Sequence, residues 1–195
     1  MVILLVTCTI ICAASLSLVL SGKGNPFDFR ISAAIISKRR PFLTKIMHFF
    51  TEIGKGVPTT VIIASLFFLL KSSAALPRIA AFSTISTLFI GKALKNLIRR
   101  VRPIENRLVE EKDFSFPSAH ALSSAALYGS IALNSTMRAP SLHLSTILLC
   151  ILLIFCIGFS RVYLGIHYLL DVIGGWSLGL VLASAFTLLF TSGIL

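Results

Sequence analysis

Residues 144–190 read LSTILLCILLIFCIGF-SRVYLGIH-YLLDVIGGWSLGLVLASAFTLLF, and this stretch decides the fold. Its two outer parts, Leu144–Phe159 and Tyr168–Phe190, are apolar runs that contain one charged residue, Asp171. A helix needs about 20 apolar residues to cross a bilayer, and fewer when flanking basic side chains reach the interface. The polar segment Ser160–His167 joins the two runs, which predicts two membrane helices connected at one membrane surface.

Four further apolar runs precede this pair, which gives six candidate spans. They are Val2–Leu20, Val57–Leu70, a run from Ile79 past Gly91 toward Asn96, and a run from His120 to about Met137. The first run lacks the basic start and the cleavage site of a secretory signal, so we interpret it as a retained span.

The composition also indicates a membrane protein. Of the 195 residues, 56% are hydrophobic, and the mean hydropathy of +0.94 is higher than a soluble domain carries. We expect an all-α fold, in which residues 1–195 form a single membrane-embedded domain built as a six-helix bundle.

Alternation of six spans places three polar segments on one membrane face. These segments are Ser21–Gly56, Lys92–Ala119 and Ser160–His167, whereas the other face has the termini and two short loops. By count, 15 of the 18 Lys and Arg residues and, with Asp171, all seven Asp and Glu residues belong to the first face. The net positive charge of this face attracts anions such as phosphorylated head groups.

One stretch on the basic face, Ile31–Phe50, mixes apolar residues with Lys and Arg. This pattern is typical of an amphipathic helix in the membrane interface, and Pro41 is expected to break it. Its expected work is structural, with a lateral path for a lipid as a second use. The run Lys38–Arg40 is equally well explained as ordinary flanking charge at the membrane surface.

The first of three polar clusters is KNLIRRVRP, residues 95–103, at the end of the third run. Lys95 and Arg102 are seven residues apart, which predicts that they share a helix face before Pro103 ends the helix. Arg offers a planar fork and Lys a compact charge, so the pair suits the oxygens of a phosphate group.

The second cluster is FPSAH, residues 116–120, immediately before the fourth run. Ser118 is placed to cap the helix, which directs its hydroxyl group and the first free N–H groups toward an anion. His120 lies in the same first turn, where it can donate a proton to a departing oxygen.

The third cluster runs from Ser160 to Asp171 and joins the last two runs. His167 and Asp171 are spaced i, i+4, so the carboxylate can orient one imidazole nitrogen and leave the other free as a nucleophile. Arg161 adds a third cation for phosphate. We treat the two remaining histidines, His48 and His143, as structural.

Together the three clusters resemble the three-part motif of the type 2 phosphatidic acid phosphatase superfamily. The family pattern is Lys with Arg-Pro seven positions on, then Pro-Ser-Gly-His, then Ser-Arg with His and Asp at fixed offsets. The six runs extend the resemblance over nearly the whole chain. The likeness is greatest to small bacterial membrane members that act on phosphatidylglycerophosphate or undecaprenyl pyrophosphate.

The resemblance implies hydrolysis of a terminal phosphate, monoester or pyrophosphate, from a membrane lipid through a phosphohistidine. It implies that His167 attacks phosphorus, that Asp171 orients it, and that His120 protonates the leaving group and later activates water. The implied phosphate-binding residues are Lys95, Arg102, Ser118, Ala119 and Arg161. It implies neither a metal nor another cofactor.

The residue at position 119 and the acidic residues of the preceding loop lead to two further expectations. The family Gly is Ala119 here, which keeps the backbone N–H but adds a methyl group near the phosphate. We expect activity to persist. The acidic residues Glu110, Glu111 and Asp113 lack the convergent spacing of a metal site, and we interpret them as solvated loop charge.

Two other function classes remain as alternatives. A transporter or channel normally has polar groups near mid-bilayer, whereas here they gather at one face. A non-catalytic protein that binds anionic lipids would not need the full set of nucleophile, acid and cations. The expected partners are the bilayer and a lipid phosphate, with no nucleic acid, and the oligomeric state is open.

Two arguments give opposite orientations for the basic face. The positive-inside rule favours the cytoplasm, whereas the resemblance implies the extracytoplasmic side of a bacterial plasma (inner) membrane. We expect the latter, because Lys95, Arg102 and Arg161 are explained by phosphate rather than by topology.

Overall fold

The computed structural model describes residues 1–70, 75–135 and 142–194, and these residues form eight helices and no strand. In chain order the helices are α1 (Val2–Leu20), α2 (Asn25–Ile36), α3 (Pro41–Ile53), α4 (Gly56–Leu69), α5 (Ala75–Ile98), α6 (Ala119–Leu133), α7 (His143–Tyr163) and α8 (Leu169–Thr191). The all-α prediction is confirmed for this part of the chain.

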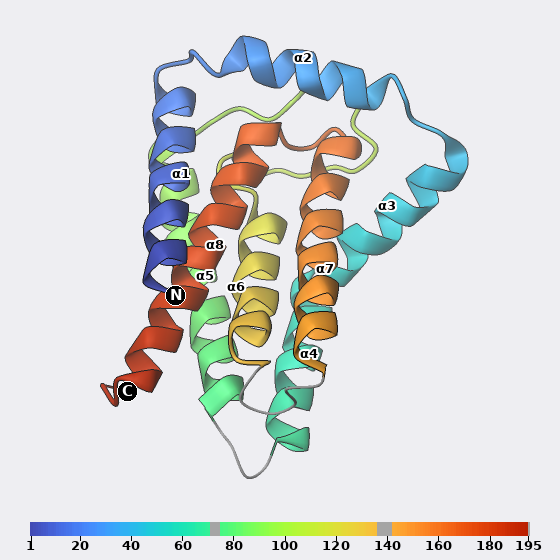
Figure 1. Cartoon of the computed structure of the whole chain (residues 1–195). Coiled ribbons are helices and arrows are strands. Elements are labelled where there is room, and N and C mark those ends of the chain that lie inside the picture. The colour runs from blue at the N-terminus through green and yellow to red at the C-terminus, as the bar shows by residue number, and fades with distance from the viewer. Residues whose placement is uncertain (71–74, 136–141, 195) are drawn as a thin grey trace.

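Helices α1 and α4 to α8 run lengthwise as a bundle (Figure 1). Helix α2 lies across one end of the bundle, and α3 slants from that end toward α4 (Figure 1). The loop between α5 and α6 and the loop between α7 and α8 lie at the same end as α2. We call this end the loop end, because it gathers the polar connections of the chain.

Helices α6 and α8 pack closely at the centre of the bundle. Gly175 and Gly179 of α8 face the backbone of α6. A Cβ atom added at Gly175 would lie 2.8 Å from the carbonyl oxygen of Ser118, and one added at Gly179 would lie 2.4 Å from that of Leu122. Small residues four apart permit this approach between membrane helices. The contact fixes the first turn of α6 beside that of α8.

Not every lengthwise helix is long and apolar enough to cross a bilayer. Among the described residues α1, α7 and α8 are, and α3 with α4 is a fourth candidate if this pair, bent by 56°, is one span. Helix α6 has 15 residues, which makes it about 22 Å long against an apolar bilayer core of about 30 Å. The six-span count is therefore not confirmed.

The predicted amphipathic helix over Ile31–Phe50 is two helices. Helix α2 ends at Ile36 and α3 begins at Pro41. Pro41 therefore starts a helix rather than interrupting one, because proline has no N–H group to lose in the first turn. Helix α2 lies across the loop end as an interfacial helix would, whereas α3 leads into the bundle (Figure 1).

Helix α5 ends earlier than the first cluster predicts. Its last residue is Ile98, and Arg99 has a φ of 50°, a left-handed conformation that stops a helix. Arg102 therefore lies in the loop, and the prediction that Lys95 and Arg102 share a helix face is wrong. The break turns Arg100 and Arg102 toward the protein interior, where their side chains are only 9% and 4% exposed.

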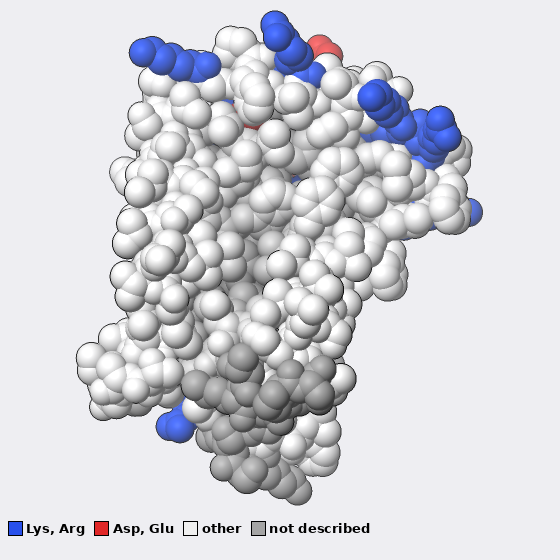
Figure 2. Space-filling view, in the orientation of Figure 1, with Lys and Arg blue, Asp and Glu red and all other residues white. Residues whose placement is uncertain are grey.

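Basic side chains gather at the loop end. Figure 2 shows Lys and Arg side chains over α2 and α3, with a smaller basic patch at the opposite end of the same view. The sides of the bundle between the two ends are free of charged side chains in this view. This distribution agrees with the predicted basic face and with a lipid-facing belt below it.

Gly179→Ala tests the contact between α6 and α8. The added methyl group would overlap a backbone oxygen that cannot move aside, so we expect the free energy of unfolding to fall by about 1–3 kcal/mol. The measurement is the melting temperature of the detergent-solubilised protein. Gly56→Ala is the matched control, because a Cβ atom there meets nothing within 4 Å. Equal melting temperatures for the two variants would contradict the proposed packing.

Candidate active site

The eight residues predicted for the site converge on the loop end from six segments of the chain. Lys95 is in α5, Arg102 is in the loop that follows, Ser118 caps α6, Ala119 and His120 begin α6, Arg161 is in the last turn of α7, His167 is in the α7–α8 loop and Asp171 is in the first turn of α8. Their contacts, described below, link them into one cluster.

His167 is fully buried beside Arg102. The Nη1 atom of Arg102 lies 2.9 Å from Nε2 of His167. A guanidinium group has only donors, so Nε2 accepts this hydrogen bond and the ring proton is on Nδ1. Burial, followed by the positive charges of Arg102 and Arg161, holds the pKa of His167 well below its ordinary value. The ring is therefore neutral at pH 7, with the Nε2 lone pair directed at Arg102.

The Nδ1 side of His167 faces a carboxylate and a hydroxyl group. Nδ1 lies 3.5 Å from Oδ2 of Asp171 and 3.4 Å from Oγ of Ser115. Ser115 in turn donates to the same carboxylate oxygen at 2.5 Å. The predicted pairing of His167 with Asp171 is thus present at ion-pair distance, and Ser115 joins the two.

Asp113 binds two of the three predicted phosphate-binding cations. Its carboxylate accepts a hydrogen bond from Nζ of Lys95 at 2.5 Å and another from the guanidinium group of Arg102. Burial would raise the pKa of Asp113, but the hydrogen bonds and charges of Lys95 and Arg102 outweigh it and lower the pKa to about 2. The carboxylate is therefore ionised at any physiological pH.

Arg161 is also bound by an acidic loop residue. Its guanidinium group donates to Oε1 of Glu111 at 2.6 Å and to the hydroxyl group of Thr51 in α3. The prediction that Glu111 and Asp113 are solvated loop charge is therefore wrong. The physical reason is that buried cations need a counter-charge, and the loop after α5 supplies it.

The start of α6 presents several polar atoms to this cluster. Ser118 occupies the N-cap position, as predicted, but its hydroxyl group makes no hydrogen bond within the described residues. Nε2 of His120 and Nε of Arg161 are likewise buried without a partner there. His120 lies within electrostatic reach of Arg161 and His167. Unsatisfied buried donors of this kind are typical of a site that binds an anion.

A cavity of about 550 Å³ reaches the site between α4 and α5. Its lining includes Lys95, Asp113, Ala119 and His120 and, farther along the two helices, Ile63, Ile85 and Leu88. Ala119 is exposed to this space, so its methyl group borders the cavity rather than being packed in the protein. A cavity that is charged at one end and apolar along its length suits a lipid with an anionic head.

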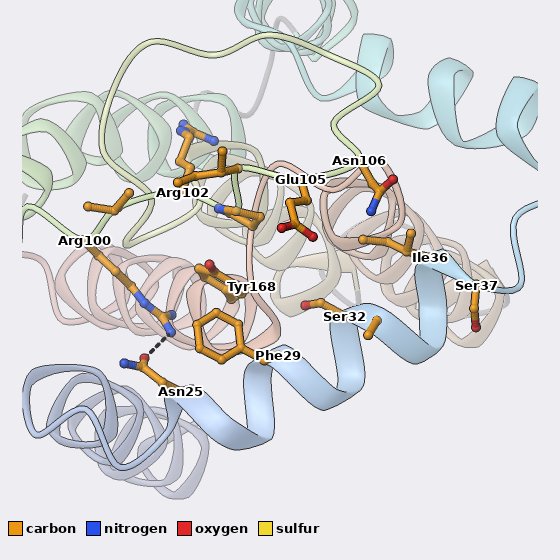
Figure 3. A pocket seen from close by; sticks show the side chains of 14 residues that line it. Asn25, Phe29, Ser32, Ile36, Ser37, Arg100, Arg102, Glu105, Asn106 and Tyr168 are labelled. Carbon is orange, nitrogen blue, oxygen red and sulfur yellow. Dashed lines mark hydrogen bonds between the residues drawn. The ribbon is translucent and has the colours of Figure 1, made fainter.

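A second cavity, of about 960 Å³, lies between α2 and the segment that follows α5 (Figure 3). Arg100 lies on its wall and donates to the side-chain oxygen of Asn25 at 3.1 Å (Figure 3). The guanidinium carbon of Arg100 lies 4.6 Å from the centre of the Tyr168 ring. Arg100 also binds the carboxylates of Asp28 and Asp171, each at 2.6 Å.

The motifs do not predict the contacts made by three further residues, Arg100, Asp28 and Ser115. Arg100 is inside the first cluster, but its role depends on the helix break at Arg99, which spacing alone does not reveal. A signal for Asp28 was present, because it is the only acidic residue between Lys23 and Lys45. A lone acid among basic and apolar residues at a membrane surface needs a partner.

Comparisons with known proteins agree with the site. Residues 76–193, more than half of the chain, match the family model of the PAP2 superfamily. The chain is 39% identical over 162 residues to phosphatidylglycerophosphatase B of Bacillus subtilis (strain 168), which covers 80% of this chain and 79% of the relative. It is 28% identical over 147 residues to an undecaprenyl-diphosphatase of Sulfolobus acidocaldarius, which covers 70% and 66%.

Two solved structures share the fold. A transmembrane PAP2-type phosphatidylglycerolphosphate phosphatase from Bacillus subtilis matches with a TM-score of 0.86 and 31% identity, over 98% of this chain and 97% of that chain. Aquifex aeolicus LpxE matches in fold, with a TM-score of 0.69 and 23% identity over 83% and 94%. With its long apolar helices, this chain is an integral membrane protein. On the family match and the first relative, the chain belongs to the PAP2 superfamily.

Proposed function

We propose that this protein is a membrane phosphatase that removes a terminal phosphate, monoester or pyrophosphate, from a lipid. The observation that carries the proposal is the neutral, buried imidazole of His167, whose Nε2 atom lies 2.9 Å from Arg102. Lys95 and Arg161 supply two more buried cations. A cavity leads from this cluster along α4 and α5, where an acyl or prenyl chain can lie. The family and the names of its relatives support the same reaction class.

In the first step Nε2 of His167 attacks phosphorus and the bond from phosphorus to the lipid oxygen breaks. The proton of His167 is on Nδ1, so Nε2 needs no prior proton transfer. The hydrogen bond that Nε2 accepts from Arg102 breaks as the Arg102 guanidinium group turns to a phosphate oxygen, which frees the lone pair for attack. The positive charge that develops on the ring is balanced by the carboxylate of Asp171, 3.5 Å from Nδ1. His120 donates a proton to the departing lipid oxygen.

In the second step water attacks the phosphohistidine, and His120, now without its proton, accepts one from that water. The bond between phosphorus and Nε2 breaks, inorganic phosphate leaves and the ring of His167 returns to its neutral form. Lys95, Arg102 and Arg161, with the Ser118 hydroxyl group and the N–H groups at Ala119 and beyond, bind the phosphate oxygens throughout. Fixed donors of this kind stabilise the charge of the transition state without reorganising.

A phosphate that enters the site has to replace two carboxylates. Asp113 occupies Lys95 and Arg102, and Glu111 occupies Arg161. Both carboxylates belong to the loop between α5 and α6 and are partly exposed, at 54% and 31%. They can therefore turn into water when a dianion takes their place, so the cations are never left buried without a counter-charge.

The site end is proposed to face the extracytoplasmic side of a bacterial plasma (inner) membrane. Counting all basic residues favours the cytoplasm. However, the side chains of Lys95, Arg100, Arg102 and Arg161 are at most 9% exposed, and each is paired with a carboxylate, so their positions are explained by these contacts rather than by topology. Without these four residues, 11 of the remaining 14 Lys and Arg residues still belong to the site face. The proposed orientation therefore rests on the resemblance to the bacterial family rather than on the charge count.

Phosphate release from a panel of lipids tests the proposed function. The panel is phosphatidylglycerophosphate, phosphatidic acid, undecaprenyl pyrophosphate and phosphorylated lipid A in detergent micelles. We expect release from at least one of them, unchanged in EDTA, because the protein side chains supply the nucleophile, the acid and the charge. Loss of all release in EDTA would overturn the metal-free mechanism, and release from none would overturn the function.

Replacing each histidine tests the assigned roles. We expect His167→Ala to lower kcat about a thousandfold or more, because the nucleophile is lost. His120→Ala should lower kcat by about 10²–10⁴-fold and leave labelled phosphate on the protein, because water attack loses its base. The measurements are phosphate release and label retained after alkaline denaturation. His48→Ala is the control and should match the wild type. Full activity of His167→Ala would refute the mechanism.

Cysteine labelling tests the orientation. In a background without the four native cysteines, Lys112→Cys places a thiol in the exposed loop at the site end, and Ser192→Cys places one at the far end. An impermeant maleimide should label Lys112→Cys in intact cells and Ser192→Cys only after permeabilisation, because the two ends lie on opposite sides of the membrane. The reverse pattern would place the site in the cytoplasm.

A further inference from the structure

A buried carboxylate outside the family motifs connects α2 to the site. Asp28 is 0% exposed, although it belongs to a helix at the surface of the loop end. One of its oxygens accepts the backbone N–H of Leu170 at 2.9 Å, and the other accepts Arg100 at 2.6 Å. Both partners are donors, so Asp28 is bound as a carboxylate.

Arg100 is the centre of this network. It is held between two carboxylates, Asp28 from α2 and Asp171 from α8, and its side chain is only 9% exposed. The ring of Tyr168 packs against its guanidinium group, as Figure 3 shows. A planar fork that binds two carboxylates at once has little freedom, so the position of Asp28 fixes the position of Arg100.

The network ends at the proposed nucleophile. Oδ1 of Asp171 accepts Arg100, while Oδ2 accepts Ser115 and the backbone N–H of Tyr168 and faces Nδ1 of His167. With Oδ1 held by Arg100, Oδ2 is the oxygen presented to the imidazole. The order of contacts is therefore Asp28, Arg100, Asp171 and His167, and every member is at most 9% exposed.

We propose that Asp28 and Arg100 are positioning residues for the phosphatase reaction, which hold Asp171 in the orientation that fixes the tautomer and angle of His167. The inference rests on the proposed function and adds two residues outside the eight assigned to the site. Neither residue lines the cavity between α4 and α5. Arg100 does lie on the wall of the second cavity, but its guanidinium group binds the carboxylates of Asp28 and Asp171. We therefore assign both residues to the orientation of the nucleophile rather than to binding of the lipid.

The separation of orientation from binding predicts a specific kinetic effect. Loss of Asp28 or Arg100 should slow formation of the phosphohistidine and leave affinity for the lipid nearly unchanged. In metal sites, replacing a residue that orients a ligating histidine without binding the metal lowers affinity or activity by about 10- to 100-fold. We expect the same range here.

The experiment compares Asp28→Asn, Arg100→Lys and the double variant with the wild type, using phosphatidylglycerophosphate in micelles. Asp28→Asn keeps the size of the side chain, and Arg100→Lys keeps the charge but loses the fork. We expect each single variant to lower kcat by about 10- to 100-fold and to slow the first turnover by the same factor. The KM of each variant should stay within about twofold of the wild-type KM. Because both act through Asp171, the double variant should lose no more than the worse single variant.

Asn25→Ala is the matched control. It removes a neutral hydrogen bond to the same guanidinium group from the same helix, but it leaves both carboxylates in place. Its kcat should equal that of the wild type. If Asp28→Asn does not yield folded protein, Arg100→Lys decides the question alone, with the melting temperature reported beside kcat.

Three results would overturn the positioning role. They are a wild-type kcat in folded Asp28→Asn and Arg100→Lys, a rise in KM without a loss of kcat, and a lower melting temperature as the sole change. A wild-type protein that hydrolyses no lipid phosphate of the panel would instead refute the proposed function, so the two failures are distinguishable.

Discussion

The burial of positive charge at one end of a membrane bundle is the constraint on which the structure depends. Lys95, Arg102 and Arg161 are at most 6% exposed, and an unpaired buried cation is strongly unfavourable. The loop between α5 and α6 meets this requirement with Asp113 and Glu111. A phosphate dianion is negatively charged and has acceptor oxygens, like these two carboxylates. A phosphate can therefore replace the carboxylates as the partner of the three cations.

A second ion network, around Arg100, satisfies its buried charge in a different way. The carboxylates that bind Arg100 are completely buried, whereas Asp113 is half exposed. Exposed partners can exchange with a ligand, while buried partners cannot leave without exposing a charge to a low-dielectric interior. The site therefore combines a replaceable set of contacts around the phosphate with a fixed set around His167.

Much of the site could be predicted from sequence, and the exceptions have a common cause. The N-cap position of Ser118, the i, i+4 relation of His167 to Asp171 and the gathering of the clusters at one end are local properties or follow from the order of apolar runs. The end of α5, the pairing of Asp113 and Glu111 with the cations, and the contacts of Arg100 were not predictable. Each depends on contacts between residues far apart in the chain, such as Arg100 with Asp28 and Asp171.

The sequence by itself determined an all-helical chain with long apolar runs, a basic end and three clusters whose residue types suit a phosphate group, because these properties reside in composition and short-range spacing. The tertiary structure decided which helices surround α6, where Arg102 lies, and which carboxylate meets which cation. The physical reason is that charge pairing inside a bundle is a property of three-dimensional proximity, and a linear pattern gives no measure of it.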